Sequence, residues 1–261
     1  MVDGMVSVVT SIYNSERYIA KAIESVLAQT YSDWEMIITD DCSTDKGPSI
    51  VESYAANDPR IHLLRLETNG GPGTARNNSV MNARGRYVAF LDSDDMWSKD
   101  KLEKQLALMK EKACGVVYSS YYVCDENDTV KGMVRCRRKV SFRRIACDNC
   151  IGFLTMMYDR KVTGDFMMSE IRKRQDWGLN IMLIRKSGVA YGVREPLATY
   201  RIHAGSVSRK KLSLIKYNVN IYRSVLGFSK VGSVLMFIFV FMPFYTGKKL
   251  LNFLQSLFDR K

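Results

Sequence analysis

The first ninety residues alternate between short apolar runs and helical patterns, and this alternation limits the chain to few folds. Apolar runs lie at 6–10, 34–39, 61–64 and 87–91, and the first of them is rich in β-branched residues. Helical patterns fill the intervals at 19–27, 48–56 and 74–83. The order β-α-β-α-β-α-β predicts an α/β fold, with a largely parallel sheet and helices on both faces.

Polar residues follow three of these runs. Thr10, Asp40 and Asp92 stand at predicted carboxyl ends, where open α/β sheets bind their ligands. Asp92 also opens an acidic stretch with Asp94 and Asp95, and such oxygen donors suit Mg²⁺ or Mn²⁺ shared with substrate phosphates. The alternative is a turn before a helix, with Asp95 or Ser98 as the N-cap.

The net charge favours an anionic partner. The chain has 39 Lys and Arg against 27 Asp and Glu, a formal charge of +12. Nucleic acid, a nucleotide diphosphate or an acidic membrane surface would each suit this excess. Nucleic acid is disfavoured, because the basic residues do not interleave with aromatic residues and the acidic stretch would repel phosphate without a metal. A nucleotidyltransferase is also disfavoured, since 11–15 contains no glycine for a phosphate loop.

The second half of the chain is harder to interpret. Strands are predicted at 116–118, 121–123, 153–158, 189–193 and 197–200. Among six cysteines, Cys147 and Cys150 have the spacing of half a zinc site, but no second pair follows and the chain has two histidines. We therefore expect reduced thiols and no zinc. No signal peptide precedes the first strand, so we expect the active region to stay in the cytoplasm.

Six motifs, in order, resemble those of family 2 glycosyltransferases, which have the GT-A fold. The resemblance covers about residues 5–208, and the remaining 209–261 is expected to form a helical extension. The motifs are Val8-Val9-Thr10-Ser11-Ile12-Tyr13-Asn14, Ser25-Val26-Leu27-Ala28-Gln29-Thr30 with Trp34-Glu35, Asp40-Asp41-Cys42-Ser43-Thr44-Asp45, Gly73-Thr74-Ala75-Arg76-Asn77, Leu91-Asp92-Ser93-Asp94-Asp95 and Arg174-Gln175-Asp176-Trp177.

The resemblance implies transfer of a sugar, with inversion, from a nucleotide-sugar donor, expected to be a UDP-hexose. Thr10 and Asp40 would hydrogen-bond the nucleotide base, because a carboxylate can accept from the N3–H of uracil. Tyr13 would lie on the base face. Arg76 would pair with the diphosphate or orient the acidic motif. Its alternative is an exposed helix arginine.

The same resemblance assigns the metal and the base. Asp92 and Asp94 would form the acidic pair, with Asp94 the direct ligand of Mn²⁺ or Mg²⁺. His203 would lie near the metal or the diphosphate, unless it is a surface residue. Asp176 would act as general base, although Gln175 replaces the acid that often precedes it. Its alternative role is to cap the following helix.

The carboxyl-terminal part suggests a membrane. Residues 231–247 carry no charge over 17 positions, which is short for a spanning helix. A buried core helix is the alternative. We expect a helix lying in or dipping into the cytoplasmic face of the bacterial inner membrane, aided by basic clusters at 135–144 and 209–216.

The acceptor expected from the family and this tail is a lipid-linked saccharide, as in lipopolysaccharide, O-antigen or capsule synthesis. A protein acceptor, or a catalytically inactive sugar-nucleotide binder, are the alternatives. Retention of Asp176 argues against the inactive binder.

Overall fold

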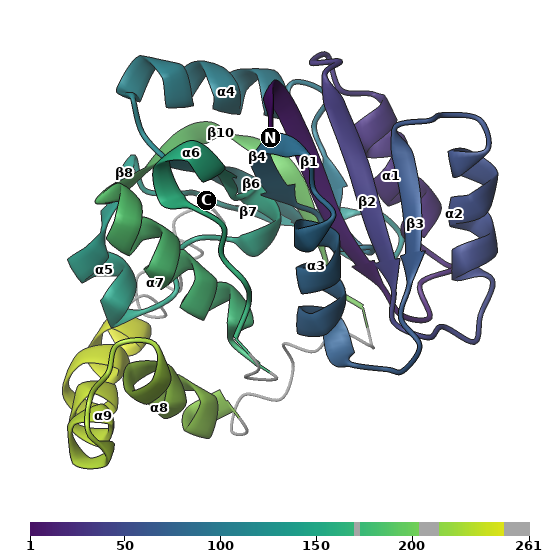
Figure 1. The fold of residues 1–261 in the computed structure, drawn as a ribbon. Helices are drawn as coiled ribbons and strands as arrows, with labels where there is room; N and C mark the ends of the chain where they lie inside the picture. Colours follow the sequence, from purple (N-terminus) through teal and green to yellow (C-terminus); the bar gives the residue numbers. More distant parts are fainter. Residues whose placement is uncertain (170–172, 204–213, 248–261) are drawn as a thin grey trace.

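A mixed β-sheet runs through the molecule between two layers of helices (Figure 1). The computed structural model describes residues 1–169, 173–203 and 214–247. Within these ranges ten strands lie in the order β3-β2-β1-β4-β9-β6-β10-β5, with β7 paired to β6 and β8 paired to β10.

The amino-terminal half has the predicted alternation. Strands β1 to β4 are parallel to one another, and each is followed by a helix until β4. The elements are β1 (Val2–Ile12), α1 (Ile19–Leu27), β2 (Trp34–Asp40), α2 (Gly47–Ala55), β3 (Ile61–Arg65), α3 (Gly71–Met81) and β4 (Gly85–Phe90). Their carboxyl ends therefore lie at one edge, as expected.

The second half makes the sheet mixed, because β9 is antiparallel to both β4 and β6. Its elements are β5 (Met96–Trp97), α4 (Lys101–Lys112), β6 (Val116–Cys124), β7 (Val130–Val134), β8 (Lys139–Ser141), α5 (Phe142–Cys147), β9 (Met157–Asp159), α6 (Arg160–Thr163), α7 (Gln175–Ser187) and β10 (Val189–Arg201).

All five strand predictions in this half were wrong in their bounds. The two runs around 116–123 form one strand, because the intervening Ser119 and Ser120 are buried and their hydroxyl groups are hydrogen-bonded. The runs at 189–200 likewise join into β10, with irregular pairing near Pro196. The run at 153–158 begins instead as a 3₁₀ turn, Phe153–Thr155, before β9.

Each face of the sheet has its own core. Alternate residues of a strand point to opposite faces. Val8 and Ile38 therefore pack with α1, α2 and α4, whereas Val9 and Ile37 pack with α3, α5 and α7. This arrangement confirms the helices predicted on both faces.

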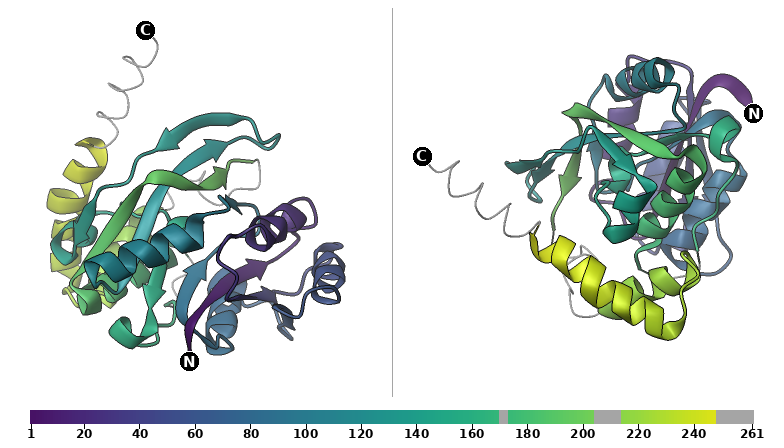
Figure 2. Two further views of the ribbon diagram at one scale, coloured as in Figure 1. Left: turned by 90° about the horizontal axis from the view of Figure 1, so that it is seen from above. Right: turned by 90° about the vertical axis from the view of Figure 1, so that its left-hand side faces the viewer.

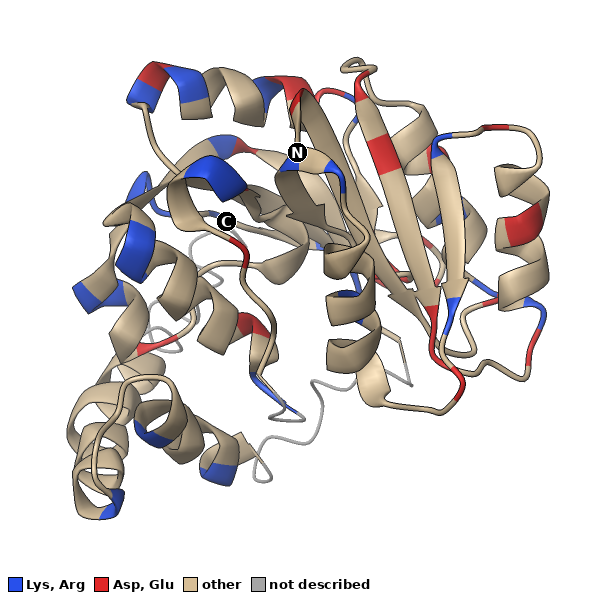
Figure 3. Cartoon of the chain, in the orientation of Figure 1, with Lys and Arg blue, Asp and Glu red and all other residues tan. Residues whose placement is uncertain are grey.

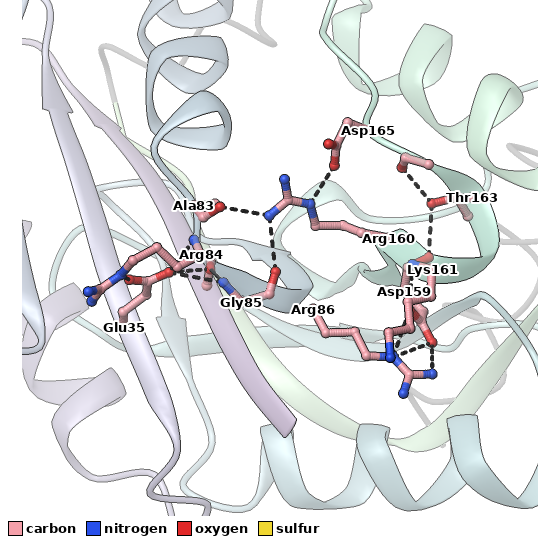
Figure 4. A network of polar contacts seen from close by, with 12 residues as sticks. Glu35, Ala83, Arg84, Gly85, Arg86, Asp159, Arg160, Lys161, Thr163 and Asp165 are labelled. Carbon is pink, nitrogen blue, oxygen red and sulfur yellow. Dashed lines mark hydrogen bonds and ion pairs between the residues drawn. The ribbon is translucent and has the colours of Figure 1, made fainter. Parts of the chain in front are cut away.

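A polar network ties the strands together at the end away from the predicted site (Figure 4). The buried carboxylate of Glu35 accepts hydrogen bonds from Ser7 Oγ at 2.6 Å, Arg84 N at 2.7 Å and Arg84 Nε at 2.8 Å. Arg86 Nε donates to both oxygens of the buried Asp159 at 3.0 Å. The Glu35 of the second motif thus has a structural role.

Two carboxyl-terminal helices lie beside α5 and α7, and Figure 2 shows them in yellow-green and yellow at one side of the molecule. They are α8 (Ile215–Ser224) and α9 (Lys230–Met236), which continues through a π-helical stretch (Phe237–Phe241) to Gly247. The buried Trp177 contacts both, with ring centroids 5.7 Å from Tyr222 and 5.5 Å from Phe241. The predicted domain boundary at 208 lies outside the described residues.

Among the described residues, one helix, Lys230–Gly247, is long and apolar enough by length and composition to cross a membrane. Only 11% of it is buried, so it is not the core helix considered as the alternative. Its buried side includes Ser233 and Phe241. Its exposed side, which we call the apolar stripe, consists of Val231, Val234, Leu235, Ile238, Phe239 and Met242.

Candidate active site

The loops after β1, β2 and β4 are joined by polar contacts. Ser15 and Ser93 share a hydrogen bond between their hydroxyl oxygens at 2.9 Å. The backbone N–H of Asn14 donates to Ser43 Oγ at 3.0 Å. The first, third and fifth motifs therefore meet at the carboxyl edge of the sheet.

Arg76 of α3 reaches this edge and forms an ion pair with Asp92. The guanidinium also lies over the ring of Phe153, 4.9 Å from its centroid. The Arg76 side chain is only 15% exposed, so it is not the exposed helix arginine of the alternative interpretation. Arg76 thus holds one of the two acids that resemble a metal-binding pair.

Asp94 faces His203, which follows β10. His203 Nε2 and Asp94 Oδ2 are 2.9 Å apart, and the imidazole lies 5.3 Å from the ring of Tyr18. Burial and the neighbouring charge of Asp92 raise the pKa of Asp94, while the contact with His203 opposes the rise. His203 is therefore part of the acidic site and not an isolated surface residue.

Asp95 has a structural role that differs from the suggested helix cap. Its side chain is buried, and Oδ1 accepts a hydrogen bond from Arg201 N at 2.9 Å. Helix α4 has Asp100 at its N-cap, without a side-chain cap. The buried guanidinium of Arg201 donates from Nε to the carbonyl of Asp94 at 2.9 Å and pairs with Asp128. Asp95 and Arg201 thus fix the backbone that carries Asp94.

Asp176 lies in the first turn of α7, and its Oδ2 accepts a hydrogen bond from Asn149 Nδ2 at 2.6 Å. It does not cap the helix, whose N-cap is Arg174. Burial raises the pKa of Asp176, and the positive charges of Arg174 and Arg76 partly oppose this rise. Gln175, the residue before Asp176, lies against Gly73 of α3, so the start of α7 meets the helix that carries Arg76.

The residues expected at the nucleotide base differ in their exposure to solvent. Tyr13 is 54% exposed just beyond β1, and Asp40 ends β2 with Oδ1 accepting from Ser43 N at 3.1 Å. Thr10 is fully buried, on the side of the strand that packs with α1 and α2, and its hydroxyl has no partner among the described residues. The hydrogen bond from Thr10 to the base therefore stays a prediction, and the donor would reach this hydroxyl only if the edge of the sheet opens around it.

Three residues of this region have side-chain partners that the sequence did not predict. Asn149 orients Asp176, Arg201 fixes Asp94, and Asp41 accepts from Gly70 N at 2.7 Å and Gly71 N at 2.9 Å. Asp41 thus shapes the glycine turn before Arg76, where Gly71 has a φ of +82°. Asp41 stood inside a quoted motif, but the partners of Asn149 and Arg201 are distant in sequence and gave no local signal.

The donor chemistry of the site fits a divalent cation only in part. Across 1–169, 173–203 and 214–247, no group of three or more His, Cys, Asp or Glu side chains is arranged to hold a metal. Asp94 and His203 converge, with Asp92 nearby. Such a set suits Mn²⁺ or Mg²⁺ if phosphate oxygens and water supply the other ligands.

An α/β sheet with polar and acidic side chains at the carboxyl ends of its strands is typical of enzymes that bind nucleotides there. Comparisons with known proteins give the family. The model of glycosyl transferase family 2 matches residues 7–164. The chain is 42% identical over 222 residues to the putative teichuronic acid biosynthesis glycosyltransferase TuaG of Bacillus subtilis, covering 85% of this chain and 88% of the relative. The chain therefore belongs to glycosyltransferase family 2 and is related to glycosyltransferases of bacterial cell-surface polysaccharides.

A second relative is the Escherichia coli enzyme UDP-Glc:alpha-D-GlcNAc-diphosphoundecaprenol beta-1,3-glucosyltransferase WfgD. It is 33% identical over 217 residues, which cover 83% of this chain and 84% of the relative.

Solved structures show the GT-A fold. Staphylococcus aureus TarS 1–349 in complex with UDP-GlcNAc superposes with a TM-score of 0.70 at 21% identity, covering 89% of this chain and 70% of that one. Mannosyltransferase PcManGT from Pyrobaculum calidifontis, in complex with GDP-Man and Mn²⁺, gives 0.63 at 16% identity, with 86% and 64% covered.

Proposed function

We propose that this glycosyltransferase moves a hexose, with inversion, from a UDP-sugar to a hydroxyl group of a lipid-linked saccharide in bacterial surface polysaccharide synthesis. The observation that carries the proposal is the convergence of Arg76 with Asp92 and of His203 with Asp94 at one edge of the sheet, where the start of α7, which carries Asp176, lies against α3. The names of the relatives support the donor and the acceptor: WfgD uses UDP-Glc and a diphosphoundecaprenol-linked sugar.

Asp176 is the proposed general base. Its carboxylate takes the proton of the acceptor hydroxyl as that oxygen attacks the anomeric carbon, and the bond from this carbon to the diphosphate oxygen breaks. The new glycosidic bond forms on the face opposite the leaving nucleotide. Burial raises the pKa of Asp176, which makes its carboxylate a stronger base than an exposed aspartate.

Asp94 and His203, with Asp92 beside them, would hold the divalent cation, which supplies positive charge at the departing diphosphate. Arg76 keeps Asp92 in place and adds a positive charge to the same edge. Asp40 and Tyr13 line the edge at which the uracil and its ribose would bind.

The test combines donor binding with turnover. The purified protein is screened with UDP-, GDP- and dTDP-sugars, with and without Mn²⁺, by thermal shift and nucleotide release. We expect metal-dependent protection by UDP-sugars. Asp176→Asn should lower turnover by about 10²-fold or more and keep the protection. Asp165→Asn, an exposed acid paired with Arg160, serves as the matched control. Full turnover by Asp176→Asn would refute the assignment of the base.

We also propose that the apolar stripe lies in the cytoplasmic face of the inner membrane. Its residues recur every three or four positions along one side of the helix, and Val231 and Phe239 are 69% and 71% exposed. Exposed apolar surface of this extent favours a membrane or a partner over water.

The membrane proposal is tested by substitutions on the stripe. Val231→Gln, Leu235→Gln and Phe239→Gln together should move the protein from the membrane fraction to the soluble fraction. The matched control changes Met81, Val130 and Val162, which are exposed apolar residues elsewhere, to glutamine. A wild-type protein that is wholly soluble at low salt without detergent would contradict the proposal.

A further inference from the structure

A hollow of about 350 Å³ lies between α8 and α9, away from the acidic motif. Lys216 and Arg223 line it from α8, and Lys230 lines it from the start of α9. Tyr217, Val219 and Val234 supply ring and aliphatic walls. The hollow therefore combines three cations with apolar walls.

The positive charge of the hollow has no acidic counterpart on the two helices that form it, α8 and α9. Residues 214–247 contain these three cations and no Asp or Glu, and Figure 3 shows blue but no red on α8 and α9. Within the described part of the chain, none of the three forms an ion pair with a carboxylate. All three residues are exposed, so their charged groups are accessible to a ligand. Three convergent cations without carboxylate partners favour an anionic ligand.

The hollow is continuous with the apolar stripe, because Val234 belongs to both. A ligand with an acidic head and a long apolar chain can therefore place the head among the cations and the chain along the helix. A free phosphate would contact only the cations of the hollow and not the apolar stripe.

The hollow is also fixed to the helix of the proposed base. Tyr222 of α8 and Phe241, beyond α9, both pack on Trp177, the residue that follows Asp176. Lys173 precedes α7, and its Nζ lies 5.8 Å from the ring centroid of Tyr217 in α8. A head group held in the hollow is thus held at a set position relative to α7.

We propose that this hollow binds the diphosphate of the lipid-linked acceptor, with Lys216, Arg223 and Lys230 as its cationic ligands. A diphosphate diester carries a charge on each phosphate, which suits three cations better than the single charge of a phospholipid phosphodiester. This inference rests on the proposed function, because that proposal supplies the saccharide acceptor to which the diphosphate is attached.

The experiment measures binding of the full chain to vesicles of phosphatidylcholine that contain a polyprenyl diphosphate, phosphatidylglycerol or no addition. Wild-type protein should bind the diphosphate vesicles most tightly. Lys216→Ala with Lys230→Ala should weaken this binding by about tenfold or more, with little change for undoped vesicles. Lys110→Ala with Lys186→Ala removes the same charge from α4 and α7 and should leave binding unchanged. Arg223→Gln provides an independent single variant.

Two results would overturn the inference. One is equal loss of binding to phosphatidylglycerol and to the diphosphate, which would make the hollow a general anionic-lipid site. The other is unchanged diphosphate binding in both hollow variants while their melting temperatures match the wild type.

Donor protection by a UDP-sugar and metal does not involve these lysines. Diphosphate binding without donor protection would therefore refute the proposed function and support the hollow. Thermal protection by the donor without diphosphate binding would refute only the assignment of the hollow as the diphosphate site.

Discussion

Asn149 donates a hydrogen bond from its side-chain amide to the carboxylate of Asp176 at 2.6 Å, across 27 positions of sequence. Asn149 Oδ1 in turn accepts from Asn180 Nδ2 at 3.2 Å, about one turn further along α7. The proposed base is thus oriented from the segment that follows α5, and α7 supports the amide that orients it.

Replacing Asn149 by alanine should change the pH profile of the enzyme. A hydrogen bond donated to a carboxylate favours its charged form, so its loss raises the pKa of Asp176 further. The base must be ionised to act, and the acid limb of kcat/KM should therefore move to higher pH. Near the optimum, kcat/KM should fall by about tenfold, as expected for a lost hydrogen bond to a charged group. The measurement is a pH series of nucleotide release.

Asn82→Ala is the control for Asn149, because the Asn82 amide donates only to the carbonyl of Asn78 in its own helix. The acid limb of kcat/KM for Asn82→Ala should lie at the same pH as that of the wild type. An unchanged acid limb in Asn149→Ala would show that the amide does not act on Asp176.

His203→Ala should weaken metal binding, because it removes the imidazole 2.9 Å from Asp94 Oδ2. The Mn²⁺ concentration that gives half of the thermal protection by UDP should rise by about tenfold or more. The chain has one other histidine, His62 of β3, and His62→Ala should leave this midpoint unchanged. Equal midpoints for the two variants would remove His203 from the metal site.

Arg201→Met should destabilise the fold. The buried guanidinium bonds the Asp94 carbonyl and pairs with Asp128, so its loss should lower the free energy of unfolding by about 3 kcal/mol. Arg17→Met is the matched control, since Arg17 also lies over Tyr18 but is 59% exposed and pairs with the exposed Glu126. It should cost no more than about 1 kcal/mol. Urea unfolding measures both, and equal losses would contradict the structural role of Arg201.

Glu35→Gln should reduce stability in a pH-dependent manner. Burial opposes ionisation of Glu35, but hydrogen bonds from Ser7 and Arg84 outweigh it and lower its pKa. A lowered pKa in the folded state contributes stability above the pKa of the unfolded chain, about 4.3, and this stability is lost as pH falls through the folded value. The free-energy difference between wild type and Glu35→Gln should be full at pH 7 and shrink below about pH 4. A difference that does not change with pH would show that ionisation of Glu35 contributes nothing.

The first four strands and their helices could be predicted because their evidence is local. β-branched runs such as Val6–Thr10 and the helical spacing of Ile19, Ile23 and Val26 report burial within a single element. The acidic motif and its neighbours could also be found, since each quoted motif is continuous in sequence. The face of the strand on which Thr10 lies was not predicted, because a one-residue difference in register decides which face a side chain takes.

What the sequence determined by itself is the alternating α/β order, the family and the identity of the charged groups at the carboxyl edge. The tertiary structure alone decided which of these groups are partners: Asp92 with Arg76, Asp94 with His203, Asp95 with Arg201 and Asp176 with Asn149. Periodicity records the environment of one element, whereas the pairs of Asp94, Asp95 and Asp176 depend on the positions that β10 and α7 take against the rest of the sheet. Those positions follow from packing between segments that are far apart in the chain, and no local spacing encodes them.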